Sequence, residues 1–168
     1  QAASLADILS HTGLTKGALY HHFPNKLALG YAVVDDTIRE EILDFWVRPL
    51  LDCENPIDCL LNILMEAGQE CGKEYAQCGC PLNNLAQEMS PVDEIFRQKI
   101  NHIYILWRQG ISQSLVKGQA NGTVCAGVNP DVVATFIVAA IEGCVGMAKN
   151  AQDVNLLFEC GKGLMHYL

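Results

Sequence analysis

The side chains here that could carry covalent or metal chemistry are eight cysteines and five histidines. Cys78 and Cys80 stand beside glycine and proline, in a segment expected to form a loop, where thiols could be exposed enough to be oxidised or alkylated. Nothing nearby in the sequence favours a thiolate, so an incidental role is the alternative. Because Cys71, Cys78 and Cys80 with His102 do not follow a known zinc-ligand spacing, we expect no metal.

An enzyme is a second class of function to consider. The sequence holds no clear Cys/His pair for nucleophile and base, no HExxH pattern and no glycine loop to cradle a phosphate. We therefore expect no catalytic residue, no cofactor and no enzymatic activity. A small helical enzyme with a cysteine nucleophile or a Cys/His metal centre is the alternative.

Hydrogen-bond donors near the N-terminus indicate nucleic-acid binding instead. Thr15, Lys16 and Tyr20 lie at the start and outer side of a short predicted helix, where they could meet phosphates or base edges. Gly17 and Ala18 are small enough to let the backbone approach DNA closely. These residue types suit a helix that enters the major groove.

Two short helices joined by a sharp turn must position these donors. Ser4 and Asp7 form a capping box at the first helix. Gly13 permits the turn, Leu14 is expected to fill the angle, and Thr15 can cap the second helix. The pattern predicts a helix-turn-helix, with a helical hairpin of some unrelated protein as the alternative.

The distribution of charge agrees with this assignment. The whole chain has a net charge of -8, which argues against coating nucleic acid or anionic membranes through bulk electrostatics. Residues 1–34 sum to +1 and the remainder to -9. The segment assigned to DNA is the one that is not negative.

Residues 14–26, LTKGALYHHFPNK, resemble the recognition-helix signature of the TetR family of bacterial regulators, and the resemblance extends over residues 4–29. It implies an all-α fold with a helix-turn-helix DNA-binding domain at residues 1–33 and an effector-binding and dimerisation domain at residues 34–168. The helix that precedes Ser4 in the family is absent from this sequence. The implied function is a one-component cytoplasmic regulator, a repressor that binds palindromic operator DNA as a homodimer and is released by a small-molecule effector.

The resemblance also implies roles for individual residues. Lys16, Tyr20 and Lys26 would contact phosphates, while base edges would face Gly17, Ala18 and His21. Ala18 stands where the family often has a hydroxyl residue, which shifts the expected readout toward thymine methyl groups. The complete set of expected DNA-binding residues is Ser4, Thr15, Lys16, Gly17, Ala18, Tyr20, His21 and Lys26.

Capping signals and apolar periodicity predict the remaining helices. Starts are expected at Asn55-Pro56, Ser90-Pro91 and Asn129-Pro130, where a capping side chain precedes proline. A long amphipathic helix should follow Asn25, and the helix after Ser90 should end at Lys117 with Gly118 as its stop. A last helix should run from about Asp153. The most apolar stretch, residues 132–148, is too short to span a bilayer, so no membrane association is expected.

The last two helices are the expected dimerisation surface, on the family resemblance and on their small residues. Ala139, Ala140, Gly143 and Gly146 would allow close helix packing between two copies, or alternatively only within one chain. For the effector pocket, the expected lining is apolar with a few polar tips, although plain core packing is the alternative for each residue. The residues are Met65, Phe96, Ile103, Tyr104, Trp107 and Phe136.

The segment CGCPLNNLAQEM, residues 78–89, resembles a stretch in a TetR subgroup that includes thiol-based electrophile sensors. The resemblance makes Cys78 and Cys80 possible redox residues. The alternative function is therefore a thiol-based redox or electrophile sensor of the same fold, in which modification of either thiol shifts helices and releases DNA.

Overall fold

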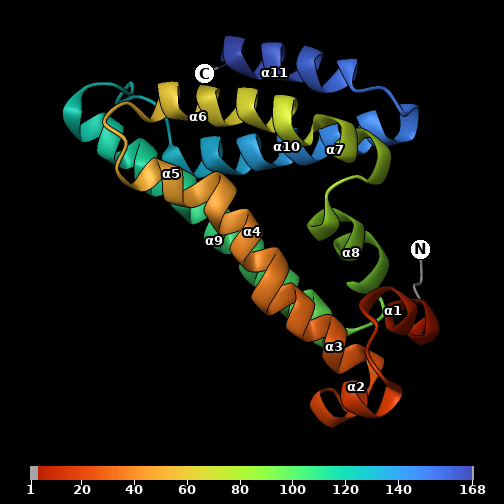
Figure 1. Cartoon of the computed structure of the whole chain (residues 1–168). Helices are drawn as coiled ribbons and strands as arrows, with labels where there is room; N and C mark the ends of the chain where they lie inside the picture. The colour runs from red at the N-terminus through yellow and green to blue at the C-terminus, as the bar shows by residue number, and fades with distance from the viewer. Residues whose placement is uncertain (1–3, 168) are drawn as a thin grey trace.

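The computed structural model describes residues 4–167, and these residues form helices with no strand among them (Figure 1). In chain order the elements are α1 (Leu5–Thr12), α2 (Lys16–His22), α3 (Lys26–Ala32), η1 (Val33–Ile38), α4 (Arg39–Ile42), η2 (Leu43–Val47), α5 (Arg48–Leu51), α6 (Pro56–Glu66), η3 (Ala67–Cys71), α7 (Gly72–Cys78), α8 (Pro81–Met89), α9 (Glu94–Asn121), α10 (Pro130–Ala151) and α11 (Asn155–Tyr167). The all-α prediction is confirmed.

Side-chain caps set several of these helix starts. The Asn55 side chain accepts from the Ile57 amide at α6, and Asn129 accepts from Asp131 and Val132 at α10. Proline follows each cap at a position where no backbone donor is needed. Both predicted starts are confirmed.

Two predicted boundaries around α9 are wrong. Ser90 ends α8, because its amide donates to the Ala86 carbonyl, and Asp93 caps α9 by accepting from Phe96. At the other end α9 continues to Asn121, and Gly122 (φ 82°) adopts the left-handed conformation. Gly118 instead lies inside the helix, where it gives room for another part of the chain.

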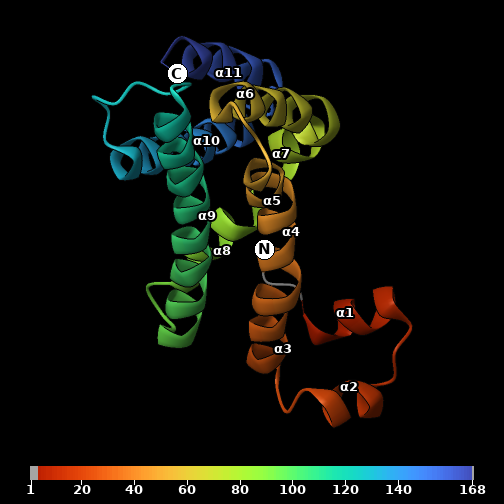
Figure 2. The same ribbon diagram turned by 90° about the vertical axis from the view of Figure 1, so that its left-hand side faces the viewer.

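Residues 26–51 form one continuous helical rod, made of α3, η1, α4, η2 and α5, with wider π-helical turns at η1 and η2. The rod runs alongside α9 (Figure 2). A Cβ added at Gly110 of α9 would lie 2.4 Å from the Val47 Cγ1 atom, so the two helices are in direct backbone-to-side-chain contact there. Trp46 and Trp107 pack with ring centroids 5.3 Å apart.

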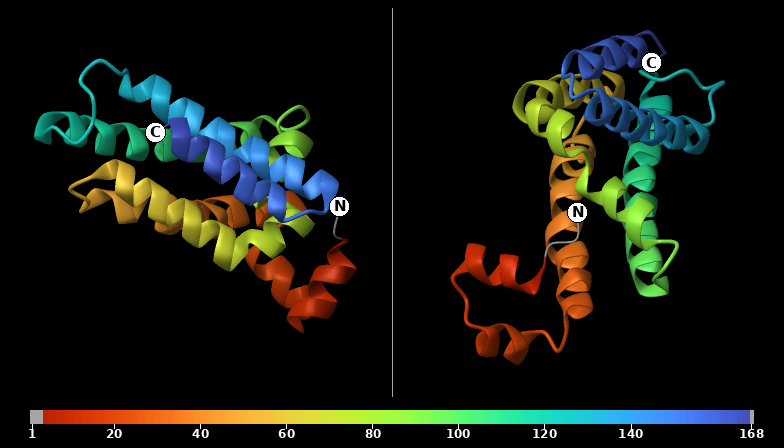
Figure 3. Two further views of the ribbon diagram at one scale, coloured as in Figure 1. Left: turned by 90° about the horizontal axis from the view of Figure 1, so that it is seen from above. Right: turned by 90° about the vertical axis from the view of Figure 1, so that its right-hand side faces the viewer.

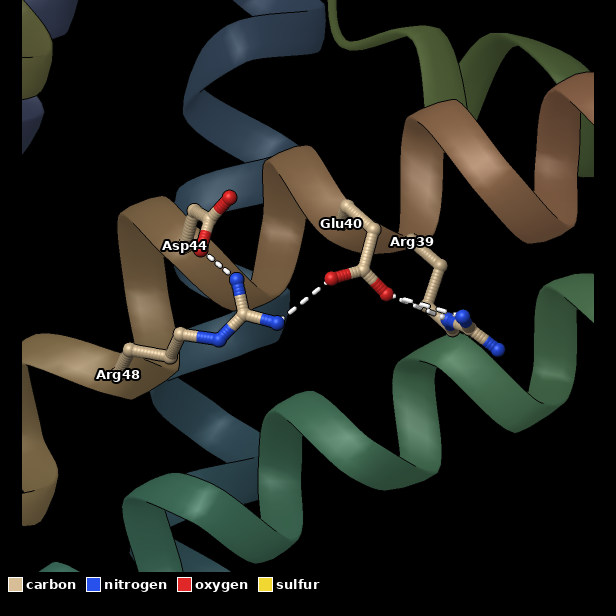
Figure 4. Close-up of polar contacts among 4 residues, drawn as sticks. All are labelled: Arg39, Glu40, Asp44 and Arg48. Atoms are coloured by element: carbon tan, nitrogen blue, oxygen red, sulfur yellow. Dashed lines mark hydrogen bonds and ion pairs between the residues drawn. The ribbon is translucent and has the colours of Figure 1, made fainter.

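The outer side of the rod carries a network of ion pairs (Figure 4). Glu40 accepts from Arg48 at 2.6 Å and pairs with Arg39 at 2.9 Å, and Arg48 also contacts Asp44. The hydrogen bond from Arg48, followed in size of effect by the one from Arg39, holds the pKa of Glu40 below its usual range. Exposed pairs of this kind contribute little to stability.

The rest of the chain forms a second layer, in which α10 packs on α9, α7 and α11. Seen from above, α10 and α11 run side by side (Figure 3, left). By length and composition alone α10 could cross a membrane. Its buried face packs into the protein core, however, and it carries the carboxylate of Glu142 near its middle.

Glu142 is the buried carboxylate of this core, with a side chain 8% exposed. Its Oε1 atom accepts from the Cys80 thiol at 3.3 Å and from the Tyr104 hydroxyl at 3.4 Å, while Oε2 has no hydrogen-bond partner among residues 4–167. Burial raises the pKa of Glu142 to about 7. A carboxylate in this position is costly because its charge is only partly compensated.

Gly110→Ala should lower the free energy of unfolding by about 1–3 kcal/mol, since the added methyl overpacks the contact with Val47. Urea denaturation measures the change. Gly163→Ala is the matched control, because a Cβ there meets nothing within 4 Å and the helix propensity gain should leave stability equal or higher. Equal stabilities of the two variants would contradict the packing account.

Glu142→Gln should change how stability depends on pH. The folded protein keeps the Glu142 proton up to about pH 7, whereas an ordinary glutamate loses it near 4.5. The raised pKa thus stabilises the folded state fully below pH 4.5, and this stabilisation is lost as the pH rises through 7. The free energy of unfolding falls by about 3 kcal/mol over this interval. The variant should therefore gain stability relative to the parent chain over this interval, measured by urea denaturation at several pH values. A constant difference between them would refute the assignment.

Candidate nucleic-acid interface and ligand cavity

The helix-turn-helix is built by local hydrogen bonds that the sequence indicated. Ser4 Oγ accepts from the Asp7 amide at 3.1 Å, and the Ser4 amide donates to Asp7 Oδ2 at 2.8 Å. Hydrogen bonding of the Asp7 carboxylate to the Ser4 side chain, then to the Ser4 amide, lowers the pKa of Asp7. Gly13 (φ 67°) makes the left-handed turn, and Thr15 Oγ1 accepts from the Ala18 amide at 3.2 Å. The predicted capping box, turn and second cap are confirmed.

The surface of α2 that was assigned to DNA is open to solvent. All eight residues of the expected DNA-binding set are exposed, whereas Leu19 on the opposite side of α2 is buried. The Lys16 ammonium lies 5.8 Å from the centre of the Tyr20 ring, so both side chains occupy one patch. Lys26 stands at the N-terminus of α3, where free amides favour an anion.

One detail of this unit differs from the expectation. Leu14 is 48% exposed, so the prediction that it fills the angle between the two helices is wrong. The apolar face of α1, formed by Leu5, Ile8 and Leu9, is only half-buried. The turn at Gly13 leads the chain outward, which leaves Leu14 on the surface.

The rod connects the DNA-binding unit to the core. Asn25 caps its first turn by accepting from the Ala28 amide at 2.8 Å. Tyr31 on α3 donates to Asp93 at 2.9 Å, and Lys99 on α9 pairs with Asp35. The first three turns of the rod are therefore tied to the start of α9.

The six residues expected around an effector are not brought together by the fold. Phe96, Ile103 and Trp107 are buried in the core along α9, while Met65 and Phe136 are exposed. The three residues of α9 belong to the core rather than to a pocket, and Phe96 packs against the rod. A Cβ added at Gly30 of the rod would lie 2.7 Å from the Phe96 ring.

A cavity of about 60 Å³ lies instead between α6, η3, α7, α10 and α11, with one wall from the rod. A single water needs roughly 10–15 Å³, so the space can hold a small molecule. Its lining is apolar except for a phenol and two thiols, and it consists of Trp46, Leu64, Ala67, Gly68, Tyr75, Ile141, Cys144, Val145, Leu157, Cys160, Gly161 and Leu164. The apolar residues of α10 could be predicted from the sequence, but which of them α11 would leave uncovered could not.

The two cysteines considered for redox chemistry occupy different environments. Cys78 is exposed at the end of α7. Cys80 is buried, and burial, then the charge of Glu142, raises its pKa to about 12. A thiol in that environment is protonated at neutral pH and is a poor nucleophile. Among residues 4–167 no group of three or more His, Cys, Asp or Glu side chains is placed to hold a metal ion.

The small residues of α10 lie mostly on its outer face. Ala139, Gly143 and Gly146 are exposed and Ala140 is half-buried. A Cβ at Gly143 or Gly146 would meet nothing within 4 Å, so neither glycine serves packing within the chain. Large apolar side chains are also exposed on α10 and α11, namely Val132, Phe136, Met147, Phe158, Met165 and Tyr167.

Comparison with known proteins identifies the family. Residues 56–162 match the family model described as transcriptional regulator LmrA/YxaF-like, C-terminal domain, and residues 1–33 match bacterial regulatory proteins, tetR family. The chain is 25% identical over 150 residues to the HTH-type transcriptional repressor DhaR of Mycobacterium sp. strain GP1, covering 85% of this chain and 70% of that protein. It is 26% identical over 153 residues to the HTH-type transcriptional regulator LmrA of Bacillus subtilis, covering 89% and 77%.

Solved structures agree in fold. The regulatory protein TetR from Rhodobacter sphaeroides superposes with a TM-score of 0.87 at 24% identity, covering 98% of this chain and 87% of that one. A TetR transcriptional regulator from Chloroflexus aurantiacus gives 0.82 at 27% identity, covering 98% and 82%. With both of its parts matched by family models and the whole fold shared, this chain belongs to the TetR family of bacterial transcriptional regulators.

Proposed function

We propose that this regulator is a cytoplasmic repressor that binds a palindromic operator as a homodimer and releases it when a small molecule binds. The observation that carries the proposal is the open donor surface of α2, held on a capped helix-turn-helix. The name of the relative DhaR, a transcriptional repressor, supports repression.

In the proposed complex, α2 enters the major groove and Lys16, Tyr20 and Lys26 contact phosphates. Gly17 and Ala18 let the backbone come close to the bases, and His21 faces a base edge. The exposure of these side chains and the cation–π contact between Lys16 and Tyr20 support this arrangement. This placement of α2 in the groove is the usual way in which a helix-turn-helix docks on a DNA duplex.

We propose that two copies pair through the outer faces of α10 and α11. The open space at Gly143 and Gly146 and the exposed apolar side chains around them support this surface over packing within one chain. Contiguous apolar surface of this kind marks interaction sites in soluble proteins. A two-fold dimer would present two α2 helices to matching half-sites.

We propose that the effector occupies the apolar cavity described above, which lies between α6, η3, α7, α10 and α11. The support is its position, because Trp46 forms part of its wall and also belongs to the rod that carries the DNA-binding unit. A ligand that contacts Trp46 differently in two orientations of the rod would shift the balance between them.

Lys16→Ala should weaken binding to operator and random duplexes by a similar factor and lower the slope of log affinity against log salt by about one unit, because one phosphate contact is lost. Titrations at several salt concentrations, on an operator selected from a random pool, measure both effects. Lys73→Ala, an exposed lysine on α7, is the control and should leave both unchanged. If the selected operator were affected far more than random DNA, Lys16 would read bases instead.

Gly143→Arg should convert the dimer to a monomer and abolish operator binding, while each chain stays folded because the site is open within the chain. Analytical ultracentrifugation reports the mass, and circular dichroism reports the helices. Gln109→Arg, which adds the same side chain to an exposed position on α9, should stay dimeric. A dimeric Gly143→Arg chain would place the interface elsewhere.

A further inference from the structure

The cavity between α10 and α11 contains two free thiols. Cys144 comes from α10 and Cys160 from α11, and both line the same space. Cys160 is close enough to Cys144 to contribute to the raised pKa of the Cys144 thiol. Two thiols from different helices therefore border one cavity.

The surroundings of this pair determine its chemistry. Among the described residues that line the cavity none is a lysine, arginine or histidine, so none of them supplies a cation to favour a thiolate. Burial, followed by the contact with Cys160, raises the pKa of Cys144 to about 12. Such thiols are slow to attack carbon electrophiles, which require the thiolate.

Two thiols that border one cavity are suited to a different class of ligand. A soft, thiophilic centre such as trivalent arsenic can bond both sulfur atoms at once while each S–H proton is released. Ordinary cysteines packed as small apolar groups would not need to share a cavity. Both of these are half-buried and border empty space.

We propose that Cys144 and Cys160 form a dithiol site for a small organic compound of trivalent arsenic or a similarly thiophilic ligand. The proposal rests on the proposed function in that it names the ligand class of the same cavity. Two sulfur–arsenic bonds form, and the oxygen of R–As=O leaves as water with the two thiol protons. No oxidant or reductant is consumed. The organic group R then lies among the apolar residues of the wall, beside Trp46 and Tyr75.

The pairing of the thiols gives the site its selectivity. Once the first sulfur has bonded, the second is held at high effective concentration, which raises the overall affinity by about 100-fold or more over one thiol. An excess of a monothiol such as glutathione should therefore remove arsenic from isolated cysteines and leave it on this pair.

The test uses the full chain with Cys53 and Cys59 both changed to serine, so that glutathione cannot produce a second dithiol from their disulfide. Phenylarsine oxide and, separately, arsenite are added in excess reduced glutathione, and intact-protein mass is the readout. We expect one arsenic atom per chain for both probes. Cys144→Ala and Cys160→Ala should each lower the apparent affinity by about 100-fold or more. Circular dichroism spectra of the two variants should match that of the parent chain, which shows that they are folded.

Matched controls come from the other cysteines. Cys53 and Cys59 form a disulfide across the α5–α6 turn, and glutathione would turn them into a second dithiol. For this reason every variant carries Cys53→Ser and Cys59→Ser, and in this background the further change Cys78→Ser should leave uptake intact. Retention of arsenic by Cys144→Ala or Cys160→Ala, or its loss in the Cys78→Ser control, would overturn the assignment.

Uptake and DNA binding are measured independently, so the two proposals fail in different ways. A chain that binds its operator but takes up neither probe overturns the ligand class and leaves the regulator standing. A chain that takes up arsenic at this pair but retains its operator when loaded overturns the cavity's proposed role in release, and supports the dithiol site.

Discussion

Two helices approach most closely where one of them lacks a side chain, and Gly110 supplies such a place on α9. There Val47 of the rod fits against the α9 backbone, while Trp46 stacks near Trp107 in the next layer of the contact. Close packing of this kind leaves the rod few alternative positions against α9. Because the rod continues without a break to Lys26, this contact also determines where the DNA-binding unit lies.

The polar cluster around Glu142 places a second constraint on the fold. Cys80 precedes the first turn of α8 and donates to Glu142 on α10, while Tyr104 reaches the same oxygen from α9. Lys149 on α10 adds a contact to Asn84 of α8 at 2.7 Å. The short helix α8 and the residue before it are thus fastened to α10 by directional bonds, and Tyr104 ties α9 to the same carboxylate, which apolar packing alone would not provide. The partly compensated charge of Glu142 is the energetic cost of this arrangement.

Local signals in the sequence were sufficient where a structural feature depends on neighbouring residues. The capping box at Ser4, the turn at Gly13 and the caps at Asn55 and Asn129 involve partners within three residues, and the sequence predicted each of them. The start of α9 was misplaced because Ser90 and Asp93 are both good caps, and the bond from Tyr31 to Asp93 involves a residue 62 positions away.

The interior was harder to predict for the same reason. Periodicity identified Phe96, Ile103 and Trp107 as an inward face of α9, but a core residue and a pocket residue have the same spacing. Which of them borders empty space depends on how α11 lies on α10, and no pattern within one helix encodes that. The exposed donors of α2 could be predicted because one short stretch of sequence specifies the turn, the helix and the side of the helix that is exposed.

The position of the cavity has a mechanical consequence that follows from the rod. Trp46 lies twenty residues from Lys26 along the same helix, a length of about 30 Å at 1.5 Å per residue. A small rotation of the rod about its contact with α9 would therefore displace α2 by much more than it displaces the cavity wall. The size of the response depends only on how differently a ligand binds the two orientations, with about 1.4 kcal/mol for each tenfold shift in their ratio. Even a small ligand can supply that difference if its contact with Trp46 forms in one orientation and not in the other.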